Sequence, residues 1–226
     1  MITEEGLDII AEGKRWVAIN KPGGIGVEKH FDHDTVEKRA LAQFKRPGAT
    51  KMPYVGIAHR LDRPVSGVLL WAQNKSTLVA LNELFAERKM TKVYHALVSS
   101  PPPKREGRLK HFLLRDKFGR KAIAAKRPLP GAKEAILDYK LLDEQDGRYL
   151  LEVRPVTGKF HQIRVQLAQM GCPIIGDGQY GSMMPFAENC IALHARSLAF
   201  VPPGERLERV VEAEYPESWS KFKFEA

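Results

Sequence analysis

Short apolar runs, separated by polar, Pro- or Gly-containing breaks, recur along the chain and predict more strands than helices. An N-terminal hairpin is predicted over residues 7–11 and 15–20, because Glu12-Gly-Lys14 supplies a turn between two apolar runs. Further strands are predicted at residues 54–58, 68–71, 93–98, 108–114, 135–142, 149–153 and 191–200.

Two helices are predicted, at residues 35–44 and 76–87. In the second, Leu78, Leu81 and Leu84 recur at helical spacing after Ser76, a candidate N-cap. Several adjacent strands without intervening helices indicate an α+β fold with a mixed, mainly antiparallel sheet flanked by helices. With 226 residues and 43% hydrophobic content, the chain forms either one domain or two tightly joined halves. We expect a single domain over residues 1–226.

A charged loop, broken by Pro and Gly, separates two of these strands and carries the first candidate for chemistry. Residues 59–67 are His-Arg-Leu-Asp-Arg-Pro-Val-Ser-Gly, so Asp62 is a lone carboxylate beside Arg60 and Arg63. These cations favour the ionised carboxylate at neutral pH, which suits nucleophilic or base chemistry. The alternative is an ordinary turn in which Asp62 accepts hydrogen bonds from backbone N–H groups.

Three blocks of the chain, in the same order, resemble motifs of RNA pseudouridine synthases of the RluA type, including the tRNA-modifying TruC branch. Residues 59–67 are similar to the HRLD-x-x-[ST]-SG motif, residues 92–98 to a K-x-Y-x-A-x-V strand, and residues 158–168 to a GRTHQIRVHLA helix start. The chain departs from the family pattern at Val65, Lys159, Phe160 and Gln166. These departures alter expected substrate contacts and leave the residues expected to carry the chemistry in place.

The resemblance implies a pseudouridine synthase fold with a central RNA-binding cleft, and it implies roles for three residues. Asp62 is the expected catalytic carboxylate, acting either as nucleophile at the anomeric carbon or as base at the neighbouring ribose carbon. Tyr94 is expected to stack on the uracil and to assist loss of the proton from carbon 5. Arg164 is expected to pair with Asp62 through charge-assisted hydrogen bonds.

Further substrate contacts follow from the geometry of a stacked RNA, in which the target atom is inaccessible until the base flips out. By the same resemblance, Arg60 is expected to fill the vacated space, and Ile163 and Leu193 to form an apolar wall against the flipped base. His59 and His161 are expected to contact the RNA or support the site.

The net charge of +9 is concentrated in one segment of the chain. Residues 104–133 contain 11 Lys and Arg against Glu106 and Asp116, while the rest of the chain carries 25 charges of each sign. This basic segment predicts phosphate contacts to RNA. The expected binding residues include Arg120, Lys121, Lys126 and Arg127. A solvated basic insertion without a partner is the alternative.

Several patterns argue against a cofactor or a metal. Residues 176–181 match G-x-G-x-x-G, but the Ser-Met-Met-Pro that follows is a poor helix start, so we expect a turn there. His59, His161 and His194 lack the H-x-x-x-H spacing, and the two cysteines lack C-x-x-C spacing. We therefore expect neither a nucleotide cofactor nor a metal.

No run approaches the roughly 18 apolar residues that span a membrane, and residues 1–6 lack an apolar signal core. We expect a cytoplasmic monomer acting on structured RNA, either tRNA or 23S-type rRNA. The Arg63-Pro64 sequence and the lack of room for a separate N-terminal RNA-binding domain favour tRNA. The rival classes are a catalytically silent RNA-binding or RNA-folding module on the same fold, and a hydrolase or nucleotidyl enzyme using Asp62 with a metal ion.

Overall fold

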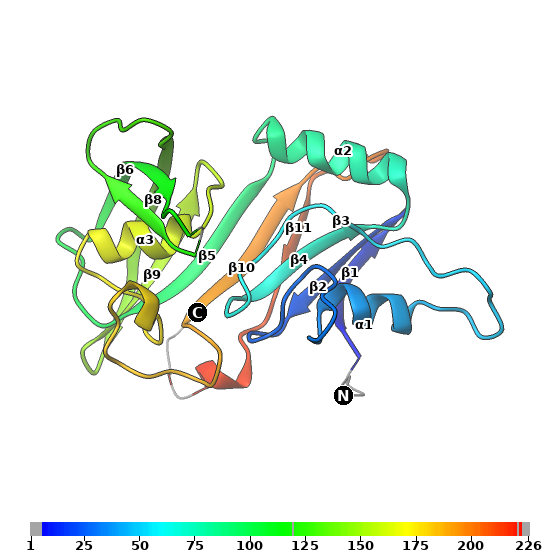
Figure 1. Ribbon diagram of the computed structural model, residues 1–226, viewed down its shortest axis with the longest axis horizontal. Helices are drawn as coiled ribbons and strands as arrows, with labels where there is room; N and C mark the ends of the chain where they lie inside the picture. Colours follow the sequence, from blue (N-terminus) through cyan, green and yellow to red (C-terminus); the bar gives the residue numbers. More distant parts are fainter. Residues whose placement is uncertain (1–5, 119, 221, 223–226) are drawn as a thin grey trace. The chain divides into compact units, whose positions relative to one another are not determined.

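Strands dominate the fold, as the short apolar runs predict. The structure is a computed structural model that describes residues 6–118, 120–220 and 222 (Figure 1). Contacts divide the chain into a first unit, Met1–Thr91 with Ala195–Pro216, and a second unit, Lys92–His194 with Glu217–Ala226. Each unit has its own strands and helices, and the single domain over residues 1–226 stays a prediction. The N-terminal segment discussed above lies, apart from Gly6, outside the described residues.

The first unit confirms the predicted N-terminal hairpin. Its elements are β1 (Asp8–Gly13), β2 (Trp16–Lys21), α1 (Val36–Gln43), β3 (Gly56–Ile57), β4 (Ser66–Ala72), α2 (Lys75–Ala86), most of β10 (Leu193–Phe200) and β11 (Arg209–Glu212). The strand order is β1-β2-β4-β10, with β3 paired to β4 and β11 to β10. The strand predicted at residues 54–58 shrinks to β3, because Tyr54 is exposed and unpaired with β4. The short, charged β11 was not predicted.

Both predicted helices are present, although the cap of the second differs from the prediction. Thr35 caps α1 by accepting a hydrogen bond from the Lys38 N–H at 3.3 Å. The prediction of Ser76 as the cap of α2 is wrong. Asn74 is the N-cap, because its side-chain oxygen accepts the Thr77 N–H at 2.8 Å, and the Ser76 hydroxyl donates to that same oxygen at 3.1 Å.

The two helices cover opposite faces of β4. Leu81 of α2 packs in a buried cluster that includes Leu70 and Phe200. The neighbouring Trp71 meets Phe44, the C-cap of α1, with ring centroids 5.7 Å apart. Successive strand residues face opposite sides of a sheet, so Leu70 and Trp71 assign one helix to each face.

The second unit holds the other strands and the third helix. Its elements are β5 (Thr91–Val98), which begins at the last residue of the first unit, β6 (Glu106–Arg115), β7 (Ala122–Ala125), β8 (Lys133–Gln145), β9 (Arg148–Pro155), α3 (Gln162–Gln169), and the 3-10 turns η1 (Gly178–Tyr180) and η2 (Glu217–Trp219). The strand order is β5-β9-β8-β6-β7. Helix α3 lies beside β6 and β8 (Figure 1). Its Val165 packs against Leu113 of β6, Ala122 of β7 and Ala135 of β8.

The strand pairs recorded within each unit are antiparallel, apart from one isolated parallel bridge between Gly26 and Thr35. Helices flank the strands in both units. The predicted α+β class, with a mixed, mainly antiparallel sheet, is therefore confirmed. Over the described residues, no helix is long and apolar enough to cross a lipid bilayer.

Candidate functional site

Asp62 lies in a tight turn between β3 and β4 of the first unit. The Val65 N–H donates to the Asp62 carbonyl at 3.0 Å, and Asp62 itself is half-buried. Gly67 has φ +110°, and a Cβ at this position would lie 2.3 Å from the carbonyl oxygen of Ala195 in β10. Only Gly permits this close approach, so the end of the Asp62 turn is held directly against a core strand.

A buried lysine, to which no role was assigned from the sequence, supports the same turn. Lys21 is fully buried, and its Nζ donates to the carbonyls of Pro22 at 2.8 Å, Ile25 at 3.0 Å and Arg63 at 3.3 Å. An ammonium group is buried only when hydrogen bonds replace its water. Lys21 therefore ties the glycine-rich loop after β2 to the backbone next to Asp62. The available signal was a lysine between an apolar strand and Pro-Gly-Gly.

Arg63 forms a second connection between the loop after β2 and the Asp62 turn. Its Nε donates to the Gly24 carbonyl at 2.8 Å, and the Gly24 N–H donates to the Arg63 carbonyl at 2.9 Å. From the sequence, Arg63 is a cation beside Asp62 and part of the Arg63-Pro64 sequence that favours tRNA. In the structure, its recorded bonds fix the backbone of the turn, which positions the carboxylate.

His59 supports the loop from its other end. The Leu70 N–H donates to its Nε2 at 3.0 Å, and its ring lies 4.7 Å from that of Phe85 in α2. Because Nε2 accepts this bond, the neutral ring carries its proton on Nδ1. These contacts are structural ones, and the predicted substrate contact of His59 stays a prediction.

Arg60, in contrast, is exposed. Its Nη1 lies 2.9 Å from Glu28 Oε2, and the two side chains are 64% and 57% exposed. Exposed ion pairs contribute little to stability because water and salt screen them. Arg60 can therefore exchange Glu28 for an RNA group at small cost, which is compatible with its predicted role.

The other residues predicted for the reaction belong to the second unit. Tyr94 lies in β5, opposite Val153 of β9, and is half-buried. Ile163 in α3 and Leu193 at the start of β10 are both buried. The predicted roles of these residues around Asp62 stay predictions.

Arg164 of α3 forms a buried ion pair that sequence reasoning missed. Its Nε lies 2.7 Å from Asp177 Oδ2, and its Nη2 lies 2.9 Å from both Asp177 Oδ1 and Gln179 Oε1. The side chains of Arg164 and Asp177 are 6% and 1% exposed. This two-point contact fixes the plane of the guanidinium group. The signal was an aspartate within the glycine motif 176–181.

That glycine motif forms a turn, as predicted. Its residues 178–180 are the 3-10 turn η1, and Gly176 and Gly181 have φ values of +86° and +91°. A Cβ on Gly176 would lie 2.6 Å from the Cβ of Phe186. The turn therefore places Asp177 and Gln179 against Arg164 and leaves no helix at the last glycine.

The turn η1 is also bonded to the β6–β7 hairpin. The hydroxyl of Tyr180 accepts the Ala122 N–H at 2.8 Å and lies 2.8 Å from His161 Nδ1. Gln179, which contacts Arg164, donates through Nε2 to the Arg120 carbonyl at 3.0 Å. A continuous set of hydrogen bonds thus joins Arg164 to the basic hairpin.

Two departures from the family pattern have internal roles. The ring of Phe160 lies 3.8 Å from that of His161 and 4.2 Å from the Arg115 guanidinium carbon. The Nε2 of Gln166 lies 3.0 Å from His111 Nδ1 and 3.2 Å from the Ala135 carbonyl, with Gln166 fully buried. The Gln166 side chain therefore connects α3 to β6 and β8 within the core.

His111, the partner of Gln166, is a buried histidine with a perturbed acidity. Burial, and secondarily the charge of Lys126, lower the pKa of His111 below its usual value of 6.5. The ring is therefore neutral at pH 7, in agreement with an Nδ1 that accepts a hydrogen bond.

The basic segment 104–133 contains two complete strands and the first residue of β8. The two strands are β6 and β7. Strand β7 was not predicted, because its four residues, Ala-Ile-Ala-Ala, form only a short apolar run within the charged segment. Two of its cations are neutralised across β6 and β8, where Arg108 pairs with Asp138 and Lys110 with Glu134. The residues predicted to bind phosphate are exposed: Arg120, Lys121, Lys126 and Arg127.

In the part of the chain that the structure describes, no group of three His, Cys, Asp or Glu side chains is placed to hold a metal ion. The site residues are instead a carboxylate, a phenol, guanidinium groups and histidines. This donor set can bind an anionic substrate and move protons.

Comparison with known proteins decides between the classes that these residues allow. The family model described as RNA pseudouridylate synthase matches residues 15–169, which include Asp62, Tyr94 and Arg164. The chain belongs to the RNA pseudouridylate synthase family. The activity of such an enzyme is the isomerisation of uridine to pseudouridine in RNA.

Individual pseudouridine synthases agree with this assignment. The chain is 32% identical to "tRNA pseudouridine synthase C" of Vibrio parahaemolyticus, over 95% of this chain and 93% of the relative. It is 34% identical to "Ribosomal large subunit pseudouridine synthase C" of Rickettsia felis, over 84% of this chain but only 61% of that longer relative. The solved structure of "Human RNA Pseudouridylate Synthase Domain Containing 4" matches 97% of this chain and 94% of its own, with a TM-score of 0.79 and 25% identity.

Proposed function

We propose that this pseudouridine synthase isomerises a specific uridine in structured tRNA or rRNA, with Asp62 as the catalytic carboxylate. The observation that carries the proposal is the Asp62 turn, which Lys21, Arg63 and Gly67 hold in one conformation. A carboxylate in a preorganised turn has little freedom to lose on reaching the reacting atoms.

The reaction rearranges bonds without any net gain or loss of atoms or electrons. The bond from ribose carbon 1 to ring nitrogen 1 breaks, the uracil turns, and a bond forms from carbon 1 to ring carbon 5. The proton leaves carbon 5, and nitrogen 1 ends with a proton. Asp62 acts either as nucleophile at ribose carbon 1 or as base at ribose carbon 2.

Two residues of the second unit complete the proposed chemistry. Tyr94 stacks on the uracil, and its hydroxyl assists removal of the carbon 5 proton. Arg164 is the proposed partner of Asp62, and the bonds that it donates to Asp177 and Gln179 fix the direction of its guanidinium group.

The substrate must present its uridine outside the base stack. Arg60 fills the vacated space, His59 and His161 support the RNA-facing loops, and Ile163 and Leu193 bound the flipped uracil. The basic segment 104–133 contacts the phosphates of the RNA. Transfer RNA is the preferred substrate, because the relative named for tRNA matches this chain over nearly its whole length. The proposed form of the enzyme is a cytoplasmic monomer without a nucleotide cofactor.

The test is incubation of the purified protein with unmodified tRNA and rRNA transcripts, followed by mass analysis of the nucleosides. Wild type should form pseudouridine without added metal, and Asp62→Asn, which keeps shape but removes the charge, should form none. Asp32→Asn, an exposed aspartate of the same unit, is the matched control and should retain activity. RNA binding by Asp62→Asn should persist. Strand scission would instead indicate the hydrolase, and RNA binding by wild type without any product would indicate the silent module.

A further inference from the structure

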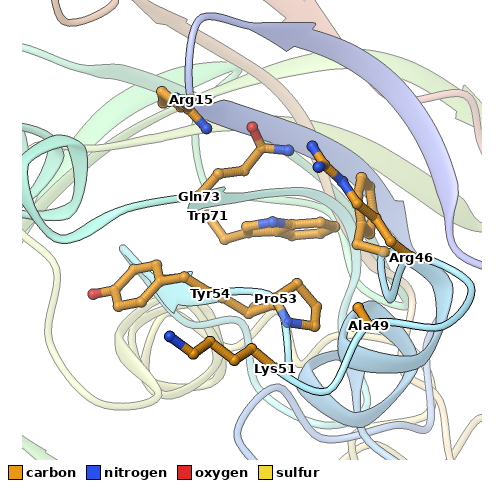
Figure 2. A pocket seen from close by; sticks show the side chains of 10 residues that line it. Arg15, Arg46, Ala49, Lys51, Pro53, Tyr54, Trp71 and Gln73 are labelled. Carbon is orange, nitrogen blue, oxygen red and sulfur yellow. The ribbon is translucent and has the colours of Figure 1, made fainter.

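Figure 2 shows side chains that line a cavity of about 370 Å³ in the first unit. The cavity lies beside Trp71, near the end of β4 opposite the Asp62 turn. Its floor includes Trp71 and Phe44, which pack edge to face. Around them lie three cations, Arg15, Arg46 and Lys51, and the half-exposed ring of Tyr54 (Figure 2). The volume falls within the roughly 300–1,000 Å³ of sites that bind small molecules or parts of larger ones.

The charge of this cavity is entirely positive. Its lining contains no Asp or Glu, and no ion pair with a carboxylate is recorded for Arg15, Arg46 or Lys51 among residues 6–118, 120–220 and 222. All three side chains are exposed. Two other exposed arginines, Arg60 and Arg108, do have acidic partners. Three uncompensated cations around one cavity favour an anionic ligand.

Arg15, one of the lining residues, has an unfavourable backbone conformation. Its φ is +72°, a region that glycine adopts readily and that strains residues with a Cβ. Its carbonyl accepts the N–H of Gln73, another lining residue, at 2.9 Å. The bond to Gln73 fixes the backbone of Arg15 beside the cavity.

The aromatic and amide groups suit a nucleobase better than a bare anion. Tyr54 is 43% exposed, so its ring offers a surface on which a base can stack. The Gln73 amide supplies both a donor and an acceptor. A phosphate on the cations and a base on Tyr54 together make up one nucleotide of an RNA strand.

The position of the cavity separates it from the target uridine. Trp71 follows Ser66 by five residues in β4, and a strand rises about 3.3 Å per residue, so the cavity lies roughly 17 Å along β4 from the Asp62 turn. A nucleotide bound there is therefore not the one that reacts.

We propose that this cavity binds a single-stranded nucleotide of the RNA substrate outside the target uridine, with Arg15, Arg46 and Lys51 on its phosphates and Tyr54 on its base. The proposal rests on the proposed function only for the identity of the RNA. It makes the first unit a second point of contact, independent of the basic segment 104–133.

The experiment measures binding and turnover of tRNA transcripts at several salt concentrations. The test variant replaces Arg15, Arg46 and Lys51 by Gln. The matched control replaces Lys75, Arg88 and Arg206 by Gln, three exposed cations of the same unit that do not line the cavity. Both variants lose the same charge, so their difference isolates the cavity.

Loss of three single-strand phosphate contacts should lower the salt slope of log affinity by about two units and weaken binding roughly 10- to 100-fold at 0.1 M salt. KM should rise by a similar factor, and kcat should stay unchanged. Tyr54→Ala should weaken binding without changing the slope, and Tyr54→Phe should restore it. Slopes and affinities of the test variant that superimpose on those of the control would overturn the proposal. Because binding is measured directly, absence of pseudouridine would count against the proposed function and leave this test intact.

Discussion

Removing the charge of Asp177 should destabilise the protein strongly, whereas removing the charge of an equivalent exposed aspartate should not. Arg164 and Asp177 form a two-point pair with N···O distances of 2.7 and 2.9 Å. Arg108 and Asp138 form another, with distances of 2.7 and 2.8 Å. The two pairs have the same geometry but differ in burial. The Arg164–Asp177 pair is buried, whereas the side chains of Arg108 and Asp138 are 63% and 40% exposed.

The magnitude follows from that difference in burial. Asp177→Asn keeps the side-chain shape but removes the charge that meets Nε and Nη2 of Arg164, and breaking a buried ion pair in this way costs about 3–5 kcal/mol. Gln179 continues to accept one bond from Arg164, so the lower end, about 3 kcal/mol, is expected. In a chain of this length each kcal/mol shifts Tm by roughly 2–4 °C, so Tm should fall by about 6–12 °C. Asp138→Asn should leave Tm close to that of wild type, because solvent already screens that pair.

Urea denaturation and calorimetry of wild type and the two variants measure these effects. Amide hydrogen exchange of α3, which carries Arg164, should accelerate in Asp177→Asn alone. Equal losses of stability in both variants would contradict the prediction, since burial would then not control the contribution of the ion pair. An unchanged Tm in Asp177→Asn would refute it as well.

Three further predictions concern other parts of the molecule. Replacing the exposed cations Arg120, Lys121, Lys126 and Arg127 together by Gln should weaken RNA binding and lower its salt slope by up to about three to four units, and superimposable titrations would contradict phosphate contact. Tyr94→Phe should retain RNA affinity but slow product formation after bond cleavage, measured in single-turnover assays; unchanged kinetics would leave Tyr94 with a packing role only. The lowered pKa of His111 means that the unfolded chain binds its proton more readily than the folded one, so the free energy of unfolding should fall as pH drops below about 6.5. His111→Gln should show a smaller fall between pH 7 and 5.5 in urea titrations, and equal falls would contradict this assignment.

The sequence predicted most of the secondary structure because local patterns control it. The hairpin β1–β2, the helices α1 and α2, and the strands β4, β5, β6, β8 and β9 all appear close to their predicted positions. The errors have local causes as well. β7 and β11 are too short and too close to charges to stand out, and Asn74 took the capping role expected of Ser76 because its side-chain oxygen reaches the Thr77 N–H.

The family and the identity of Asp62, Tyr94 and Arg164 as candidates were also available from the sequence, because the chemistry requires specific side chains in ordered motifs. The roles of the residues that support these candidates, Lys21 and Asp177, could not be predicted from the sequence. Lys21 and Asp177 are charged residues that a sequence places on the surface, and only folding surrounds Lys21 with three carbonyls and Asp177 with a guanidinium group.

The distribution of charge was likewise predicted only in part from the sequence. The sequence located the basic segment 104–133, but tertiary pairing decided that Arg108 and Lys110 are neutralised across β6 and β8. The cavity of Arg15, Arg46 and Lys51 draws on three separate stretches of chain and has no sequence motif. Local propensity and residue chemistry are properties of a segment, and a sequence determines them directly. Burial, charge compensation and the assembly of distant side chains depend on which segments meet, and only the tertiary structure decides that.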